Sequence, residues 1–195
     1  MELIATRNAK LTAIALVVVA LTQVAYITLK GDTITGTMIW TVEAFAFLAI
    51  AVLPLTVIGR STAPLAWGAL SLFGVFNVVQ AGMGLTMFAP LDNAGEAMAA
   101  AKAAVLAFAF FMYFSGKMML GLAAIIIGLG LFKTGGGLAK AVGGLAAVAG
   151  LAAFLGNGAG IIHGIEAVRI AGATGTVAAL FAAIAIFMIP RSDAA

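Results

Sequence analysis

The 195-residue sequence contains no cysteine, and its only histidine is His163. The absence of cysteine excludes disulfide bonds, iron–sulfur ligation and thiol nucleophiles. A single histidine cannot supply both axial ligands of a bis-histidine haem, so the chain alone cannot form a b-type cytochrome. Charged residues are also scarce, since Asp, Glu, Lys and Arg make up 9% of the chain, whereas a soluble domain uses about a quarter. The sequence is therefore not that of a soluble protein.

Hydrophobic residues take the place of the missing charges. They make up 64% of the sequence, the mean hydropathy is +1.21, and 24 residues are glycine. At about 20 residues per spanning helix, the chain has room for six or seven membrane crossings and for no soluble catalytic domain. The formal net charge of +3 comes from basic residues scattered along the chain, so we expect no nucleic-acid partner. The composition predicts an all-α polytopic membrane protein surrounded by membrane lipids.

Six apolar runs have the length of transmembrane helices and form a single integral membrane domain over residues 1–195. They cover residues 11–29, 38–58, 65–88, 97–132, 138–155 and 174–189. The fourth run is long enough for two spans, but its small and polar residues, among them Tyr113, Lys117 and Gly128, keep one helical phase. We therefore expect one long helix there. Asn93 and Glu96 have the spacing of a capping box at its start.

Basic residues predict the orientation, because they are enriched in cytoplasmic loops. With six spans, both termini lie on one side, together with Arg7, Lys10, Arg60, Lys133, Lys140 and Arg191. The opposite side has only Lys30, Lys102 and Arg169. This asymmetry predicts a multi-pass protein of the bacterial inner membrane with both termini in the cytoplasm.

Glycine and alanine recur at helical spacing on three of the predicted spans. The positions are Gly74, Ala81 and Gly84, then Gly121, Ala124 and Gly128, and then Gly143, Gly144, Ala147 and Gly150. Small residues let helix backbones approach closely in lipid. We expect these faces to pack inside the bundle; the alternative is an interface with another membrane subunit or with a second copy of the chain.

One region of the chain resembles a known family. Residues 114–117 (FSGK), 128–131 (GLGL) and 141–151 (AVGGLAAVAGL) are similar to the fourth and fifth spans of an uncharacterised family of six-span bacterial integral membrane proteins. The resemblance rests on spaced glycines in this part of the chain. It implies a six-helix fold and no known activity.

Polar residues inside the predicted spans gather in the half of the membrane away from the termini. They are Gln23, Glu43, Gln80 and Lys117; Asn77 lies near the midplane, and Tyr113 shares a helix face with Lys117. Such residues are unfavourable in lipid, so each is a candidate for function. Glu43 and Lys117 have opposite charge at similar depth, and we expect them to lie in contact as a structural ion pair or polar network. The alternatives are a site for a solute, an ion or a proton, and a Lys117 side chain that reaches out to the membrane surface. Asn77 and Gln80 are expected to hydrogen-bond across helices, with ligand contact as the alternative.

The glycine-rich segment between the last two spans, residues 156–173, carries a second polar group. Its members are Asn157, His163, Glu166 and Arg169. We expect a loop outside the membrane, which is able to dip back into it where protein or water satisfies its backbone. His163 and Glu166 have the spacing of one helical face but make only half of a metal site, so no metal ion is predicted.

Several enzyme classes lack the residues that they need. No aspartate lies inside a predicted span, and no Walker loop, dinucleotide fingerprint or zinc-protease signature is present. We therefore expect a non-catalytic accessory or partner-binding subunit of a membrane assembly, with no cofactor. A small transporter or channel that uses the polar residues is the first alternative, and an intramembrane enzyme is the second. The membrane half near the termini has few polar residues, which argues against a continuous conducting path.

Overall fold

The computed structural model describes residues 2–29 and 33–189. Within them the chain consists of helices joined by short turns and contains no strand. The first elements are α1 (Glu2–Leu29), α2 (Thr33–Val52) and the short α3 (Leu55–Ile58). They are followed by α4 (Pro64–Met83), a π-helix (Gly84–Phe88), α5 (Ala89–Asn93) and a 3-10 turn (Gly95–Met98). The last elements are α6 (Ala99–Thr134), α7 (Gly137–His163), a second 3-10 turn (Gly164–Ala167) and α8 (Val168–Met188).

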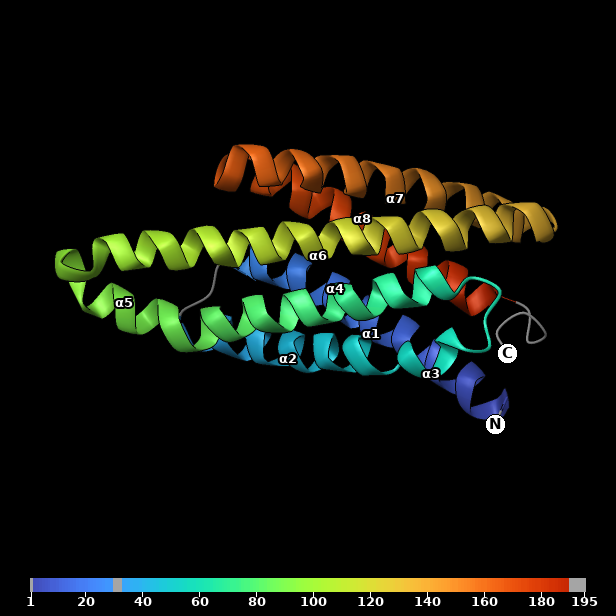
Figure 1. Ribbon diagram of the computed structural model, residues 1–195, viewed down its shortest axis with the longest axis horizontal. Helices are drawn as coiled ribbons and strands as arrows, with labels where there is room; N and C mark the ends of the chain where they lie inside the picture. Colours follow the sequence, from blue (N-terminus) through green and yellow to red (C-terminus); the bar gives the residue numbers. More distant parts are fainter. Residues whose placement is uncertain (1, 30–32, 190–195) are drawn as a thin grey trace.

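Five helical segments within the described residues are long and apolar enough to cross a membrane. They are Leu3–Leu29, Thr35–Ile58, Pro64–Asn93, Gly95–Thr134 and Gly137–Met188. The last has 52 residues, but it turns back at Gly164. This residue has a φ of 66°, which glycine adopts without strain because it has no Cβ. α7 and α8 consequently pack along one another (Figure 1). The structure confirms an all-α chain whose helices suit a membrane.

The long fourth run is one uninterrupted helix, α6, as its helical phase predicts. Two other predictions are wrong. Residues 156–173 are not a loop, because α7 continues to His163 and α8 begins at Val168. Glycines weaken a helix in water, but lipid offers the backbone no other hydrogen-bonding partner, so the helix persists through them. Asn93 is not an N-cap either, since it is the last residue of α5 and no side chain caps α6.

The end of α4 contains an irregularity that the sequence explains. Pro90 has no backbone N–H, and in a regular α-helix its ring would clash with the carbonyl of Thr86. The residues before α5, Gly84–Phe88, form a π-helix instead, and the wider turn relieves this crowding. Trp40 of α2 packs over Gly84, where a Cβ would collide with the indole ring. The chain therefore stays helical through Pro90 as far as Asn93.

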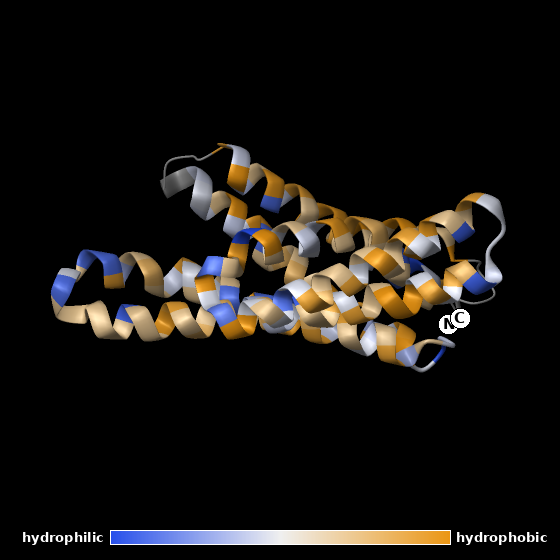
Figure 2. Cartoon of the chain, turned by 90° about the horizontal axis from the view of Figure 1, so that it is seen from above, coloured by the Kyte–Doolittle hydropathy of each residue, from blue (hydrophilic) through white to orange (hydrophobic). Residues whose placement is uncertain are grey.

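The long helices run back and forth along a common axis (Figure 1). α1 begins and α8 ends at the same end of the bundle, which we call the terminal end. At the opposite end, the far end, α5 and the first turns of α6 extend beyond the other helices (Figures 1 and 2). This projection is among the more hydrophilic parts of the chain (Figure 2), and it carries an ion pair between Asp92 and Lys102.

Glycines bring neighbouring helices into backbone contact. A Cβ on Gly121 of α6 would stand 2.7 Å from the carbonyl oxygen of Gly150 of α7, and a Cβ on Gly128 would stand 2.6 Å from that of Gly143. A Cβ on Gly74 of α4 would collide with the backbone of α2. These small residues therefore pack inside the bundle, where a larger residue would push the backbones apart.

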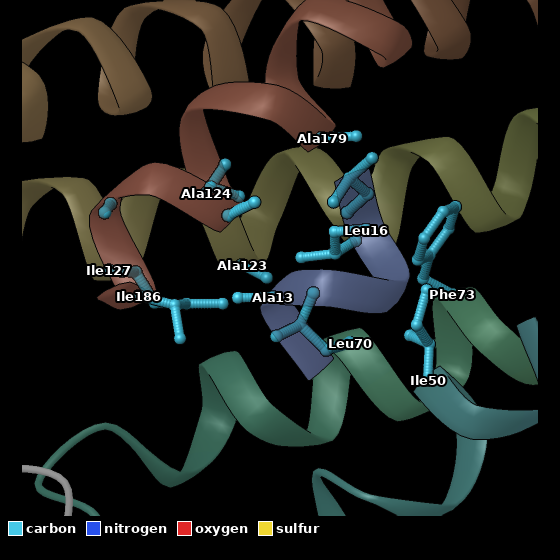
Figure 3. Close-up of a cluster of buried hydrophobic side chains, with 14 of the residues drawn as sticks. Ala13, Leu16, Ile50, Leu70, Phe73, Ala123, Ala124, Ile127, Ala179 and Ile186 are labelled. Atoms are coloured by element: carbon cyan, nitrogen blue, oxygen red, sulfur yellow. The ribbon is translucent and has the colours of Figure 1, made fainter. Parts of the chain in front are cut away.

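A continuous apolar core fills the bundle from its terminal end to its middle. Residues of α1, α2, α4, α6, α7 and α8 contribute to it, and Figure 3 shows part of it, from Ala13 of α1 to Ile186 of α8. Polar side chains in this region form hydrogen bonds with other groups of the protein. Ser71 Oγ, for example, donates a hydrogen bond to Ala51 O of α2 over 2.9 Å. The terminal half of the bundle is therefore closely packed and largely apolar.

Candidate polar site in the helix bundle

Lys117 lies in the middle of α6 and has no exposed surface. Its Nζ donates a hydrogen bond to Gln23 Oε1 over 2.9 Å. The same atom lies 5.6 Å from the centre of the Phe73 ring and 5.5 Å from that of Tyr113, distances at which a ring face attracts a cation. The lysine stem passes Gly175 of α8, where a Cβ would stand only 2.7 Å from Lys117 Cδ. Glycine at position 175 therefore makes room for the lysine.

Gln23, near the end of α1, connects three helices. Its Oε1 accepts the hydrogen bond from Lys117 of α6 and a second one, over 2.6 Å, from Thr176 Oγ1 of α8. Between helices in a membrane, hydrogen bonds of this kind contribute roughly 0.6–1.7 kcal/mol each. We refer to Gln23, Glu43, Lys117 and Thr176 as the polar cluster.

Glu43 of α2 is the acidic member of the polar cluster and is half-buried. Its Oε1 accepts a hydrogen bond from Thr22 Oγ1 over 3.4 Å, and its carboxyl also has the Gln23 side chain as a hydrogen-bonding neighbour. The predicted ion pair with Lys117 is absent, since no salt bridge among the described residues includes either group. Gln23 is a neighbour of both groups, because its Oε1 accepts the hydrogen bond from the Lys117 ammonium and its side chain lies beside the Glu43 carboxyl.

The alternative in which Lys117 reaches out to the membrane surface is also wrong, because the whole side chain is buried. Its stem is enclosed by α8 at Gly175, and its Nζ faces the rings of Phe73 and Tyr113. Tyr113 itself is half-buried, and its ring packs edge-on against that of Phe114 with centres 5.5 Å apart. Aromatic rings therefore flank the ammonium of Lys117.

The two amides of α4 behave differently from the prediction. Asn77 has no exposed surface; its Nδ2 donates to Phe73 O of the same helix over 2.9 Å, and its Oδ1 has no partner within the described part of the chain. Gly116 of α6 leaves the space that this side chain occupies. Gln80 is half-buried and makes no hydrogen bond with another described residue. Neither amide therefore bridges two helices. The Asn77 amide instead bonds to a nearby carbonyl of its own helix, which competes with partners on other helices.

Three aromatic rings lie just beyond the polar cluster, toward the far end. The centre of the Trp40 ring is 5.9 Å from that of Tyr26 and 5.8 Å from that of Phe88. Tyr26 and Trp40 are each three residues from the nearest member of the polar cluster, Gln23 and Glu43 respectively, which is about 4.5 Å along a helix. Because Tyr and Trp favour the boundary between lipid and water, we expect the polar cluster to lie just inside that boundary.

The second group of predicted residues does not form one site. Asn157 is fully buried in α7, and its Nδ2 donates to a carbonyl of its own helix over 2.8 Å and to Ala171 O of α8 over 3.1 Å. It therefore links the last two helices. His163, Glu166 and Arg169 are exposed around the turn that joins those helices. Within residues 2–29 and 33–189, no three His, Cys, Asp or Glu residues are grouped so that they could hold a metal ion.

Two hydroxyl groups of the site were not predicted from the sequence, those of Thr22 and Thr176. Threonine in a helix commonly bonds to its own backbone, and Thr176 Oγ1 also lies 2.9 Å from Gly172 O, so its one hydrogen is shared between that carbonyl and Gln23. The sequence feature that could indicate Thr176 is the preceding Gly175, because the long buried side chain of Lys117 needs a small residue beside it. The sequence alone does not show which helix faces Lys117.

Comparisons with known proteins add no relative: no protein-family model matches the chain, and neither the curated proteins nor the solved structures include a match. The resemblance to an uncharacterised six-span family therefore stays a prediction. Chemically, the polar cluster brings together one amine, one carboxyl, one amide and one hydroxyl, all bound to one another or to neighbouring helices.

Proposed function

We propose that the chain is a non-catalytic, six-span protein of the bacterial inner membrane that serves as an accessory or partner-binding subunit of a membrane assembly. The observation that carries this proposal is the use of the interior polar groups. Lys117 and Thr176 both donate hydrogen bonds to Gln23, Asn157 joins α7 to α8, and an apolar core fills the terminal half. The interior side chains hold the helices together, which leaves the outer surface as the place for function.

Six crossings are supported by the separate lengths of α7 and α8. α7 has 27 residues and α8 has 21, which corresponds to about 40 Å and 32 Å of helix. A length of about 30 Å is enough to cross the hydrocarbon layer. Both helices also pack against α6, so each counts as a crossing of its own.

The basic residues support termini in the cytoplasm. Those of the terminal end are Arg7, Lys10, Arg60, Lys133 and Lys140, and those of the far end are Lys102 and Arg169; Lys30 and Arg191 lie outside the described residues. Reporter fusions after Gly136 and after Gly164 test the arrangement. The first is expected in the cytoplasm and the second outside, whereas reporters on the same side would contradict six crossings.

α4 offers the surface that we assign to a partner. Four residues of one row are exposed by 39% or more, and two glycines of the same row have open space where a Cβ would stand: Leu65, Leu72, Val75 and Val79, with Gly68 and Gly82. Their spacing alternates between three and four residues, which aligns them along one side of the helix. Glycines in such a row let another helix approach closely in lipid.

Native mass spectrometry of the tagged protein from gently solubilised membranes tests the partner. A stoichiometric partner subunit or second copy is expected with the wild type. Val75→Trp should reduce it at least tenfold, because the indole would hold the two helices apart. Val148→Trp on α7 is the matched control, since Val148 is 69% exposed, and it should retain the partner. A wild-type chain that is always alone, or equal loss with both variants, would contradict the proposal.

A small transporter that uses the polar cluster is the second candidate, and it is favoured by the half-buried carboxyl of Glu43 just inside the far-end boundary. A transport path needs polar lining on both sides of the membrane, and the core toward the terminal end is apolar. Reconstituted alone into liposomes, the protein is expected to show no ion or solute flux above empty vesicles. Flux that Glu43→Gln abolishes would make this candidate the better one.

A further inference from the structure

A groove of about 520 Å³ opens between the first half of α6 and the end of α7 with its following turn. On the α6 side its wall includes Ala107, Phe110, Phe111 and Phe114. On the α7 side it is lined by apolar residues and by His163, the one ionisable side chain of the wall. Ligand sites in proteins have volumes of about 300–1,000 Å³ and combine apolar walls with a few polar groups. The groove has both properties.

The depth of the groove restricts what can fill it. Phe114 precedes Lys133 by 19 residues and Gly160 follows Lys140 by 20, so the floor of the groove lies about 30 Å from the basic residues of the terminal end. That distance equals the hydrocarbon thickness of a bilayer. Ala103, at the other end of the groove, lies about 17 Å farther along α6. The groove therefore runs outward from the edge of the hydrocarbon layer through the headgroup region.

We propose that this groove binds one membrane amphiphile, whose apolar chain or ring lies against the phenylalanines and whose oxygen-bearing head accepts a hydrogen bond from His163. The acyl chains of the surrounding bilayer end at the edge of the hydrocarbon layer and do not fill the groove. Water solvates the aromatic residues of its wall poorly. A molecule that has an apolar part and a polar head satisfies both halves of the site. Phospholipids and ring-headed isoprenoid lipids share this chemistry. The inference relies on the proposed crossings for its depth, but not on a partner subunit.

The shape of the groove favours a lipid over a helix of another protein. The wall residues of α6 span Ala103 to Phe114, about 16 Å of helix, and a helix about 10 Å wide needs roughly 1,250 Å³ over that length. The groove has less than half of this volume. Its lower end is closed where the Phe114 ring packs against Gly160 so tightly that a Cβ would stand 2.6 Å from Phe114 Cδ1. An extended chain or a single ring fits such a short, closed groove.

The test measures lipids that remain bound to the detergent-purified protein after extensive washing, by mass spectrometry of the extract. The wild type is expected to retain about one amphiphile per chain, enriched over its share of the membrane. Ala107→Trp fills the groove from its wall and should lower the retained amount at least tenfold. Ala104→Trp places the same indole at another exposed position of α6 outside the groove and should leave retention unchanged.

The head contact is tested by His163→Phe, which keeps an aromatic ring but has no hydrogen-bond donor. Loss of one such bond should lower retention about tenfold. A retained phospholipid or a retained isoprenoid lipid would each support the site and identify its source. No retained amphiphile in the wild type, or equal loss with Ala104→Trp and Ala107→Trp, would overturn the proposal. Reporter fusions after Gly136 and Gly164 report the crossings separately, so failure of the two proposals is distinguishable.

Discussion

Removing Gln23 should destabilise the protein more than removing Lys117, although lysine carries the charge. In Gln23→Leu the buried ammonium loses its hydrogen-bond acceptor, and no other acceptor lies within bonding distance of Nζ among the described residues. An uncompensated buried charge costs about 3–5 kcal/mol of unfolding free energy. In Lys117→Met the charge itself disappears, a stem of similar length fits beside Gly175, and Gln23 Oε1 keeps its hydrogen bond from Thr176. We expect this variant to lose only about 1–2 kcal/mol.

The double variant Gln23→Leu with Lys117→Met tests whether the stability losses of the two single variants simply add. Once the lysine is gone, leucine at position 23 leaves no unpaired ammonium, so the double variant should be more stable than Gln23→Leu alone, with a coupling of about 2 kcal/mol or more. The cycle of Glu43→Gln with Lys117→Met should give a smaller coupling, because no direct ion pair joins those two side chains.

The assay is the folded fraction in mixed micelles against the mole fraction of SDS, followed by the fluorescence of Trp40 and Trp67. Gln80→Leu is the matched control, since Gln80 is a half-buried amide without a hydrogen bond to another described residue, and it should change stability by about 0.5 kcal/mol or less. Equal losses for Gln23→Leu and Lys117→Met, together with an additive double variant, would refute the proposed role of Gln23.

Glycine substitutions test the packing around the site and between the helices. Gly175→Ala should lower the unfolding free energy by about 1–3 kcal/mol, because its Cβ would press on Lys117 Cδ. Lys117→Met should relieve part of this loss, because its side chain is not held in place by the hydrogen bond to Gln23 and can shift away; no relief would mean that the crowding lies elsewhere. Gly128→Ala should lower the SDS midpoint clearly, since its Cβ would stand 2.6 Å from a carbonyl oxygen of α7, whereas Gly130→Ala on the same helix has open space and should be neutral or slightly stabilising. Similar midpoints for these two variants would contradict close packing of α6 on α7. Gly82→Ala on α4 serves as a further open-space control, and its midpoint should stay near that of the wild type.

The class of fold is predictable from composition, because a chain so poor in charge must satisfy its backbone inside lipid, and helices do this within one segment. The uninterrupted α6 is predictable for a related reason, since its small and polar residues keep one phase from end to end. The ends of the last two helices are not predictable from the sequence. Residues 156–173 contain enough glycine to suggest a loop, but helical hydrogen bonding in lipid outweighs the local preference of glycine, and only the turn at Gly164 remains.

The members of the polar cluster were easier to predict than their pairing. Gln23, Glu43 and Lys117 stand out in the sequence because each is polar within an apolar run. Which of them meet depends on how far each helix is rotated about its axis, and no single helix contains that information. Lys117 and Glu43 have opposite charges at similar depth, yet the Gln23 side chain is a neighbour of both and no direct ion pair joins them. Thr176 gives no signal of its own, because threonine is common at the ends and on the faces of such helices.

The contact between Gln23 and Thr176 also has a consequence for the order of events during synthesis. The two residues are 153 positions apart, and Lys117 follows Gln23 by 94. At about 5–20 residues per second, roughly 8–30 s pass between the synthesis of Gln23 and that of Thr176. For the first 94 residues of that interval neither donor to the Gln23 amide oxygen exists, and Thr176 is missing until its end. The first helix must therefore wait at the insertion machinery, at the lipid boundary or beside α2 until the last helix arrives to complete its hydrogen bonds.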